Sequence, residues 1–271
     1  MLTRVDNDVV LDHQIFGDTE GDPLLVITGT SLSWLLWNDF AKALAAEGYR
    51  VICYDHRGIG ASPRGSGEIS MSALAADATS LLDALGIGQV HVLGWSLGSC
   101  VAQELAITYP ERVKSLILAN TWHRTDGYQR ALFTSFRHLW ATGEAEIAWT
   151  AQTAASFSPE LLDSPAFGQV MSEISPALPR TEAQKATVVE QWSADLAHDT
   201  EDRLASIACP TLVVTGEQDL VTPARQGRAV AEAIPGAQLE SVRGPGSSHA
   251  LAWERQDEFV RTVVGFLGRQ S

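Results

Sequence analysis

The amino-acid sequence predicts an α/β protein, built on a mostly parallel sheet that is flanked by helices on both faces. Short apolar runs alternate with helix-patterned segments along most of the 271 residues, which is typical of parallel strands joined by crossover helices. One long interval, from about 122 to about 206, breaks this alternation because it contains helical patterns and no convincing strand. We therefore expect a core domain of residues 1–121 and 207–271, with residues 122–206 inserted as a helical cap, or lid.

Each element of the core follows from a local pattern. Residues 9–16 alternate between apolar and polar side chains, which is typical of an antiparallel strand. The later strand segments are mostly continuous apolar runs, as expected for parallel strands buried on both faces. Glycine or proline ends several helical segments. The expected strands are 9–16, 23–27, 50–54, 90–93, 114–119, 211–215 and 238–242, and the expected helices are 40–47, 72–85, 97–109, 224–233 and 256–267.

The segment Gly94-Trp95-Ser96-Leu97-Gly98 places a serine between an apolar strand and a helix-patterned stretch. This is the pattern of a nucleophile elbow. The two glycines have no Cβ, so the chain turns sharply and the helix packs close to the strand. The turn holds the serine in an unusual backbone conformation with its Oγ exposed. A glycine-rich turn with a solvated serine is the alternative, but the strand–turn–helix context favours the elbow.

A nucleophilic serine needs a base that takes its proton and an acid that orients the base. His249 lies in the loop after the last expected strand, at the same sheet edge as Ser96. Asp219 follows the preceding strand, within the segment 216–223, and Glu217 is its rival as the acid. A turn or helix-capping role is the alternative for Asp219, and a surface loop position is the alternative for His249. We expect Ser96, Asp219 and His249 to form a catalytic triad.

Acyl transfer also requires two donors for the negative charge that develops on the carbonyl oxygen. We expect these donors to be the backbone N–H of Leu97, next to the nucleophile, and that of Thr30, which follows the strand 23–27. Gly29 allows that loop to approach closely. Ser31 and Trp95 are further pocket candidates because they neighbour Thr30 and Ser96. Trp122 and His123 are candidates because they follow the strand 114–119, at the sheet edge where open α/β sheets bind ligands.

Composition and charge argue against several classes of partner. The net charge of −14 disfavours nucleic acid and anionic membrane surfaces. The first residues lack the apolar core of a signal peptide and no stretch approaches the length of a membrane span, so we expect a cytoplasmic protein. The three cysteines lie in or beside apolar runs without metal-ligand spacing. We expect no metal and no cofactor, a small-molecule substrate and, as an open possibility, a homo-oligomer.

Together these motifs resemble the α/β-hydrolase superfamily across nearly the whole chain. The matching segments are 94–98, 55–62, 109–113, 216–223 and the loop of His249. The resemblance implies an eight-stranded sheet with the lid between strands 6 and 7, and a triad in the chain order Ser, Asp, His. Within the superfamily, residues 118–121 resemble 3-oxoadipate enol-lactonases, and residues 120–157 also resemble aminoacrylate hydrolases of pyrimidine breakdown. The elbow serine is unlike the dehalogenase and epoxide hydrolase branches, which use aspartate there.

The sequence therefore predicts a cofactor-free serine hydrolase that cleaves a carboxylic ester or lactone of a small to medium apolar substrate through an acyl-enzyme. Two alternatives stay open. A carbon–carbon bond hydrolase or a perhydrolase of the haloperoxidase type would use the same triad. A non-catalytic ligand-binding module could also keep this fold and these residues. The oxyanion loop has Thr28-Gly29 where many relatives have His-Gly. This loop and the lid decide among these reactions, and the sequence does not show which reaction they favour.

Overall fold

A single eight-stranded sheet organises the protein, in the order β1-β2-β4-β3-β5-β6-β7-β8. The computed structural model describes residues 1–6, 8–143 and 145–270. The pairs β1–β2 and β2–β4 are antiparallel, and all later pairs are parallel. The strands are β1 (Leu2–Arg4), β2 (Val10–Phe16), β3 (Asp22–Ile27), β4 (Tyr49–Tyr54), β5 (Val90–Trp95), β6 (Val113–Ala119), β7 (Thr211–Gly216) and β8 (Gln238–Val242). The predicted mostly parallel α/β architecture is confirmed.

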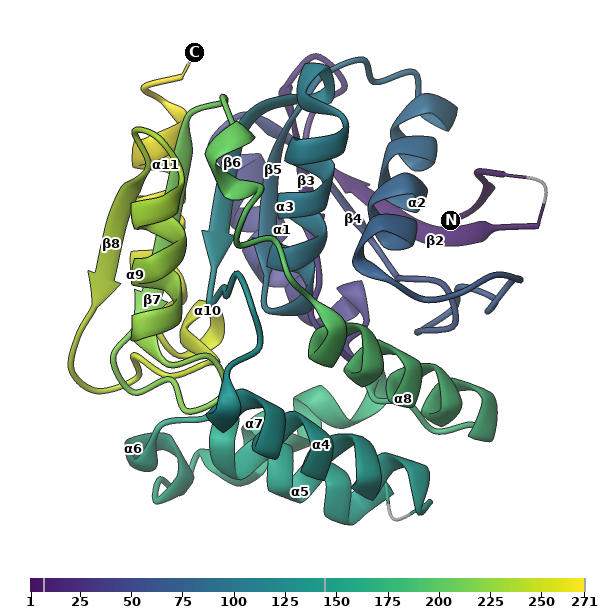
Figure 1. Cartoon of the computed structure of the whole chain (residues 1–271), viewed down its shortest axis with the longest axis vertical. Helices are drawn as coiled ribbons and strands as arrows, with labels where there is room; N and C mark the ends of the chain where they lie inside the picture. The colour runs from purple at the N-terminus through teal and green to yellow at the C-terminus, as the bar shows by residue number, and fades with distance from the viewer. Residues whose placement is uncertain (7, 144, 271) are drawn as a thin grey trace.

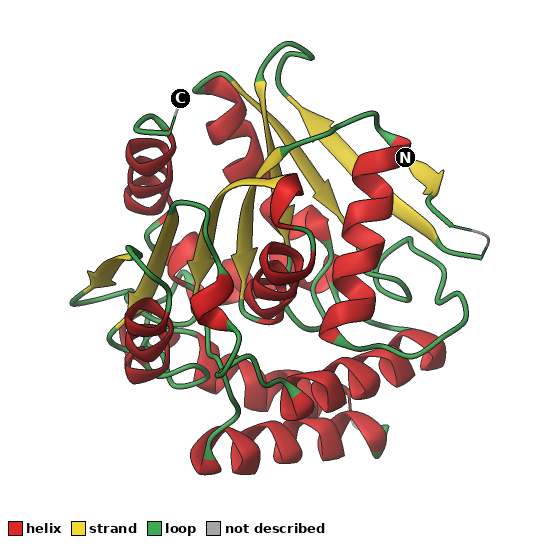
Figure 2. Cartoon of the chain, turned by 45° about the horizontal axis from the view of Figure 1, so that its top comes forward, coloured by secondary structure: helices red, strands yellow, loops and turns green. Residues whose placement is uncertain are grey.

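Helices cover both faces of this sheet (Figure 2). In the core they are α1 (Asn38–Ala46), α2 (Met71–Ala84), α3 (Leu97–Thr108), α9 (Ala224–Ala233), α10 (Leu251–Glu254) and α11 (Gln256–Leu267). Alternate side chains of a strand point to opposite faces. Accordingly Leu25 and Ile27 join the apolar cluster that contains α2, α3 and α9, whereas Leu24 and Val26 join the cluster of α1 and α11. Two-sided burial explains why these strands are continuous apolar runs in the sequence.

The short strand β1 is the one element of the sheet that no local pattern indicates. It has three residues and pairs with β2 through registers such as Leu2 with Asp12. A strand of this length lies below the four to eight residues over which alternation can be recognised. It is an edge strand and does not affect the position of the site.

The chain between β6 and β7 folds into helices at the carboxyl ends of the strands (Figure 1). They are α4 (Gly127–Ala141), α5 (Ala145–Ser156), α6 (Pro159–Leu162), α7 (Phe167–Ile174) and α8 (Glu182–Ala197). We call these helices the helical insertion. Aromatic rings join its helices, since Trp192 of α8 packs against Phe133 and Phe136 of α4 with centroids 5.1 and 5.2 Å apart. Helix α8 is also tied to the core, where Glu190 accepts a hydrogen bond from Arg64 Nε at 2.7 Å.

None of the helices in the three described ranges is both long enough and apolar enough to cross a lipid bilayer.

Candidate active site

Ser96 lies between β5 and α3 in a strained turn. Its φ of 55° and ψ of −127° are unfavourable for a residue with a side chain, at a cost of about 1–3 kcal/mol. The flanking glycines make the turn possible. A Cβ on Gly94 would lie 2.2 Å from the carbonyl oxygen of Gly98, and a Cβ on Gly98 would lie 2.1 Å from that of Ile27. The elbow therefore requires glycine at both positions, as the sequence pattern indicates.

The structure brings the three predicted triad residues together at the carboxyl edge of the sheet. His249 Nε2 is 3.0 Å from Ser96 Oγ, and His249 Nδ1 is 2.8 Å from Asp219 Oδ2. All three residues are buried, which shields their hydrogen bonds from water. The rival acid Glu217 is exposed instead, and its carboxylate pairs with Arg243 Nε at 3.2 Å.

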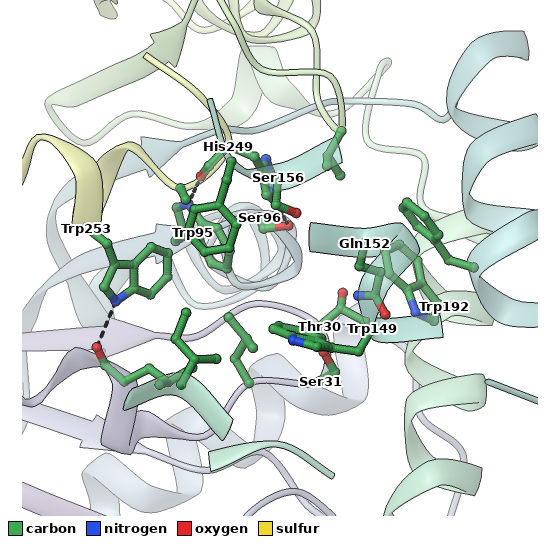
Figure 3. A pocket seen from close by; sticks show the side chains of 17 residues that line it. Thr30, Ser31, Trp95, Ser96, Trp149, Gln152, Ser156, Trp192, His249 and Trp253 are labelled. Carbon is green, nitrogen blue, oxygen red and sulfur yellow. Dashed lines mark hydrogen bonds between the residues drawn. The ribbon is translucent and has the colours of Figure 1, made fainter. Parts of the chain in front are cut away.

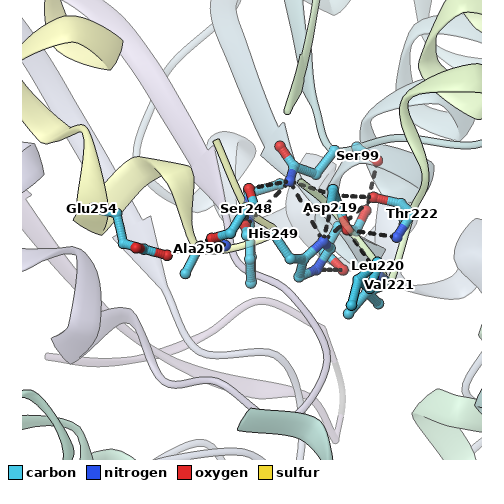
Figure 4. A network of polar contacts seen from close by, with 12 residues as sticks. Ser99, Asp219, Leu220, Val221, Thr222, Ser248, His249, Ala250 and Glu254 are labelled. Carbon is cyan, nitrogen blue, oxygen red and sulfur yellow. Dashed lines mark hydrogen bonds and ion pairs between the residues drawn. The ribbon is translucent and has the colours of Figure 1, made fainter. Parts of the chain in front are cut away.

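The carboxylate of Asp219 is fixed by donors from its own loop (Figure 4) and from the residue that follows β6. Its Oδ1 accepts the backbone N–H groups of Val221 and Thr222, each at 2.8 Å, and its Oδ2 accepts the hydroxyl of Thr222 at 2.7 Å. A carboxylate can only accept, so His249 donates to it from Nδ1–H. Nε2 of the neutral imidazole is then the acceptor that faces the Ser96 hydroxyl.

Asn120 joins the two loops of this network, although the triad pattern in the sequence does not include it. It directly follows β6 and has a φ of 52°, a left-handed conformation that asparagine tolerates. Its Nδ2 donates to Asp219 Oδ2 at 2.6 Å and to the carbonyl oxygen of His249 at 3.2 Å. A polar residue at the end of a buried strand was the available signal, because that edge carries the other site residues.

The loop after β3 approaches the elbow closely. A Cβ on Gly29 would lie 2.5 Å from the ring of Trp95 and 3.1 Å from Ser96 Cβ, so only glycine fits there. Thr30 and Ser31 line the same pocket as Ser96. Leu97 is the first residue of α3, where an N–H has no intrahelical acceptor. In the described ranges, no backbone hydrogen bond outside the helices and strands uses the N–H of Thr30 or Leu97 as donor.

Helix α8 of the insertion holds this loop through two buried side chains one turn apart. Gln191 Oε1 accepts the backbone N–H of Ser31 at 2.8 Å, and Asp195 Oδ2 accepts the hydroxyl of Thr30 at 2.7 Å. Ser31 has a φ of 68°, so the contact with Gln191 supports a strained residue. Burial raises the pKa of Asp195 to about 8, against the opposing effect of the Thr30 hydroxyl. No local pattern indicates Gln191 and Asp195, since their role depends on how α8 packs onto the core.

A pocket opens over Ser96 between the core and the helical insertion (Figure 3). The space between its walls, including the open mouth, is about 590 Å³. Its walls are mostly apolar and aromatic. They are formed by Thr30, Ser31, Leu32, Leu36, Trp95, Ser96, Phe136, Trp149, Gln152, Ser156, Phe157, Ile174, Trp192, Val221, His249, Ala250 and Trp253.

Two of the predicted pocket residues lie outside this lining, whereas Ser31 and Trp95 belong to it. Trp122 is turned into the core, with its ring centroid 5.5 Å from that of Phe133 and its carbonyl oxygen bonded to Gln103 of α3. His123 faces Glu201, with 3.6 Å between Nε2 and Oε1. The structure places both outside this pocket, because the end of β6 fixes the sheet edge but not the direction of the following side chains.

Among the described residues, no group of three or more His, Cys, Asp or Glu side chains is arranged to hold a metal ion.

Comparisons with known proteins agree with this geometry. A family model described as the alpha/beta hydrolase fold matches residues 22–256. The chain is 32% identical over 268 residues to a protein of Azorhizobium caulinodans named as the carbamate hydrolase RutD, covering 96% of each chain. It is 31% identical over 268 residues to 3-oxoadipate enol-lactonase 2 of Acinetobacter baylyi, covering 98% of this chain and 96% of that one.

Two solved structures show the same similarity in three dimensions. The enol-lactonase from Burkholderia xenovorans superposes with a TM-score of 0.88 at 25% identity, over 98% of this chain and 99% of that one. A Mycobacterium tuberculosis protein described as the non-heme bromoperoxidase BpoC superposes with a TM-score of 0.85 at 28% identity, over 96% of each chain.

Proposed function

Because the chain belongs to the α/β hydrolase fold family, we propose that it is a cofactor-free serine hydrolase that cleaves a carboxylic ester or lactone through an acyl-enzyme. One observation carries the proposal. Ser96 Oγ, His249 and Asp219 form a continuous hydrogen-bonded line, with contacts of 3.0 and 2.8 Å, at the floor of an apolar pocket. This is the arrangement by which a serine hydroxyl loses its proton as it attacks a carbonyl carbon.

In the first half of the proposed reaction, Ser96 Oγ bonds to the carbonyl carbon while its proton passes to His249 Nε2. Asp219 stabilises the imidazolium that results. The carbonyl oxygen becomes negative and is bound by the N–H groups of Thr30 and Leu97. His249 then gives the proton to the leaving alkoxide, the carbon–oxygen bond breaks, and the acyl group remains on Ser96.

In the second half, water attacks the acyl-enzyme. His249 takes a proton from the water, the same two N–H groups bind the new oxyanion, and Ser96 leaves with the proton that His249 returns. A lactone follows the same steps, with the difference that the leaving hydroxyl stays attached to the acid. The apolar walls of the pocket support an apolar acyl or alcohol group of small to medium size.

A carbamate is the second candidate substrate. It is favoured by the relative named as a carbamate hydrolase, which is 32% identical over 96% of the chain. The same nucleophile and oxyanion donors would act on a carbamate carbonyl. The perhydrolase alternative is in turn suggested by the structural neighbour described as a non-heme bromoperoxidase.

A substrate panel tests these proposals. We would measure kcat/KM for p-nitrophenyl esters of two to eight carbons, simple lactones, vinylogous diketones and p-nitrophenyl carbamates, and peracid formation from acetate and hydrogen peroxide. We expect turnover of esters and lactones that is lost in Ser96→Ala. Preferred turnover of carbamates, diketones or peroxide would move the assignment to that reaction, and a folded protein with no turnover of any compound would contradict the proposal.

A further inference from the structure

The wall that the helical insertion contributes to the pocket carries a fixed amide donor, Gln152 of α5. The indole N–H of Trp140 donates to Gln152 Oε1, and an indole nitrogen cannot accept. This contact settles which end of the amide is oxygen, so Nε2 and its two hydrogens take the other position. Gln152 lines the pocket, and Figure 3 shows its nitrogen on the side of the cavity. No hydrogen bond from this nitrogen is present within the described part of the chain.

Three polar atoms that belong to other lining residues are buried without a partner among the described residues. They are the indole nitrogens of Trp149 and Trp192 and the hydroxyl of Ser31. The two indoles can only donate. Buried donors are normally paired, so several unpaired donors around one cavity indicate acceptor atoms on the ligand that fills it.

The described residues of the pocket carry no charge that would match an ionised substrate. Among them the lining includes no lysine, arginine, aspartate or glutamate, and His249 is the one titratable side chain. A carboxylate or phosphate in this cavity would be desolvated without a cation to pair with. The net charge of −14 also repels anions as they approach.

We propose that the substrate of this site is an uncharged ester or lactone whose acyl chain bears a further neutral acceptor oxygen, of the keto, ether or ester type, bound by the donors of Gln152, Trp149 and Trp192. The inference rests on the proposed serine hydrolase function. The inference restricts the expected substrates from esters and lactones with any apolar acyl group to those whose acyl group carries a keto, ether or ester oxygen.

The experiment compares four p-nitrophenyl esters of nearly equal length: hexanoate, 4-oxohexanoate, 5-oxohexanoate and the monoester of adipate, which ends in a carboxylate. For the wild type we expect at least one oxo ester to exceed hexanoate in kcat/KM by about tenfold, as one well-placed hydrogen bond provides. We expect the adipate monoester to fall below hexanoate. We define the oxo preference as the ratio of kcat/KM for the better oxo ester to kcat/KM for hexanoate. Trp192→Phe and Gln152→Met each remove one donor, and each should lower this ratio to within about threefold of one.

Trp253→Phe is the matched control. Trp253 also lines the pocket, but its indole N–H already donates to the carbonyl oxygen of Leu36 at 2.9 Å. The control should therefore keep the wild-type oxo preference even if overall turnover changes. Equal kcat/KM for oxo and plain esters in the wild type, or a preference that survives in both donor variants, would overturn the inference. A folded protein that hydrolyses none of the four esters and turns over no other compound of the substrate panel would contradict the serine hydrolase proposal itself, and the inference with it.

Discussion

Replacing Gln191 with leucine should lower kcat far more than it changes KM. Gln191 is fully buried in α8, and its Oε1 accepts the N–H of Ser31 at 2.8 Å. Leucine has a similar size but no acceptor. The change therefore acts on the loop that contains Thr30, one of the two proposed oxyanion donors, and touches neither Ser96 nor His249.

The magnitude follows from the strain of that loop. An unpaired buried N–H costs about 1–3 kcal/mol. Ser31, at a φ of 68°, costs about 1–2 kcal/mol more for its left-handed conformation. Both penalties are relieved if the loop relaxes, and their sum of about 2–5 kcal/mol is for the most part larger than the roughly 1–3 kcal/mol of the hydrogen bond from Thr30 to Asp195, which still ties the loop to α8. The Thr30 N–H then moves away from the oxyanion, and loss of one such donor lowers kcat about 10²–10³-fold.

The assay is steady-state hydrolysis of p-nitrophenyl hexanoate, with circular dichroism and thermal unfolding to confirm that the variant is folded. Glu190→Gln is the control, since Glu190 is the preceding residue of α8 and bonds Arg64 rather than the oxyanion loop. We expect the control to keep kcat within about twofold, as exposed ion pairs contribute little. A folded Gln191→Leu protein with kcat within twofold of the wild type would show that α8 does not hold the oxyanion loop.

Three further perturbations test other parts of the account. Asp219→Asn should lower kcat about 10³–10⁴-fold while Glu217→Gln leaves it unchanged, and the reverse pattern in ester hydrolysis would reassign the acid. Burial raises the pKa of Asp195 to about 8. Between about pH 4 and 8 the folded protein therefore keeps a proton on Asp195 that the unfolded chain has released. The resulting stabilisation of the folded state is fully present below about pH 4 and is lost as the pH rises through about 8. Thermal unfolding from pH 5 to 9 should therefore show a smaller loss of stability with rising pH in Asp195→Asn than in the wild type, and equal slopes would contradict the burial argument. Gly98→Ala should destabilise the protein by about 1–3 kcal/mol or more in urea unfolding, because its Cβ meets a backbone oxygen of β3 at 2.1 Å. Gly265→Ala, on α11 with open space around its Cβ, should be neutral or stabilising, and a similar loss in both variants would refute the steric explanation.

The core of the fold could be predicted because its physical causes are local. Buried parallel strands are continuous apolar runs, and the helices between them end at glycine or proline. The segments 224–233, 238–242 and 256–267 were expected from these patterns and form α9, β8 and α11 with the same bounds. The triad residues follow from the same logic, because parallel strands bring their carboxyl ends to one edge.

The contribution of the helical insertion could not be predicted in the same way. Gln152 and Gln191 are ordinary polar residues in helical sequence, and their importance depends on which helix face packs against the pocket. Trp122 illustrates the opposite case, since its position after β6 indicated a ligand contact while its side chain turns into the core. The positions of these three side chains depend on contacts between segments far apart in sequence, and no periodic pattern in the sequence predicts such contacts.

The most direct test of the account is mass spectrometry of the intact protein after treatment with a fluorophosphonate, beside Ser96→Ala treated in the same way. An activated serine attacks the phosphorus, expels fluoride and gains a stable mass, whereas an ordinary serine does not react. We expect a single adduct on the wild type and none on the variant. A folded wild-type protein that gains no adduct, or an adduct that persists in Ser96→Ala, would contradict the assignment of Ser96 as the nucleophile.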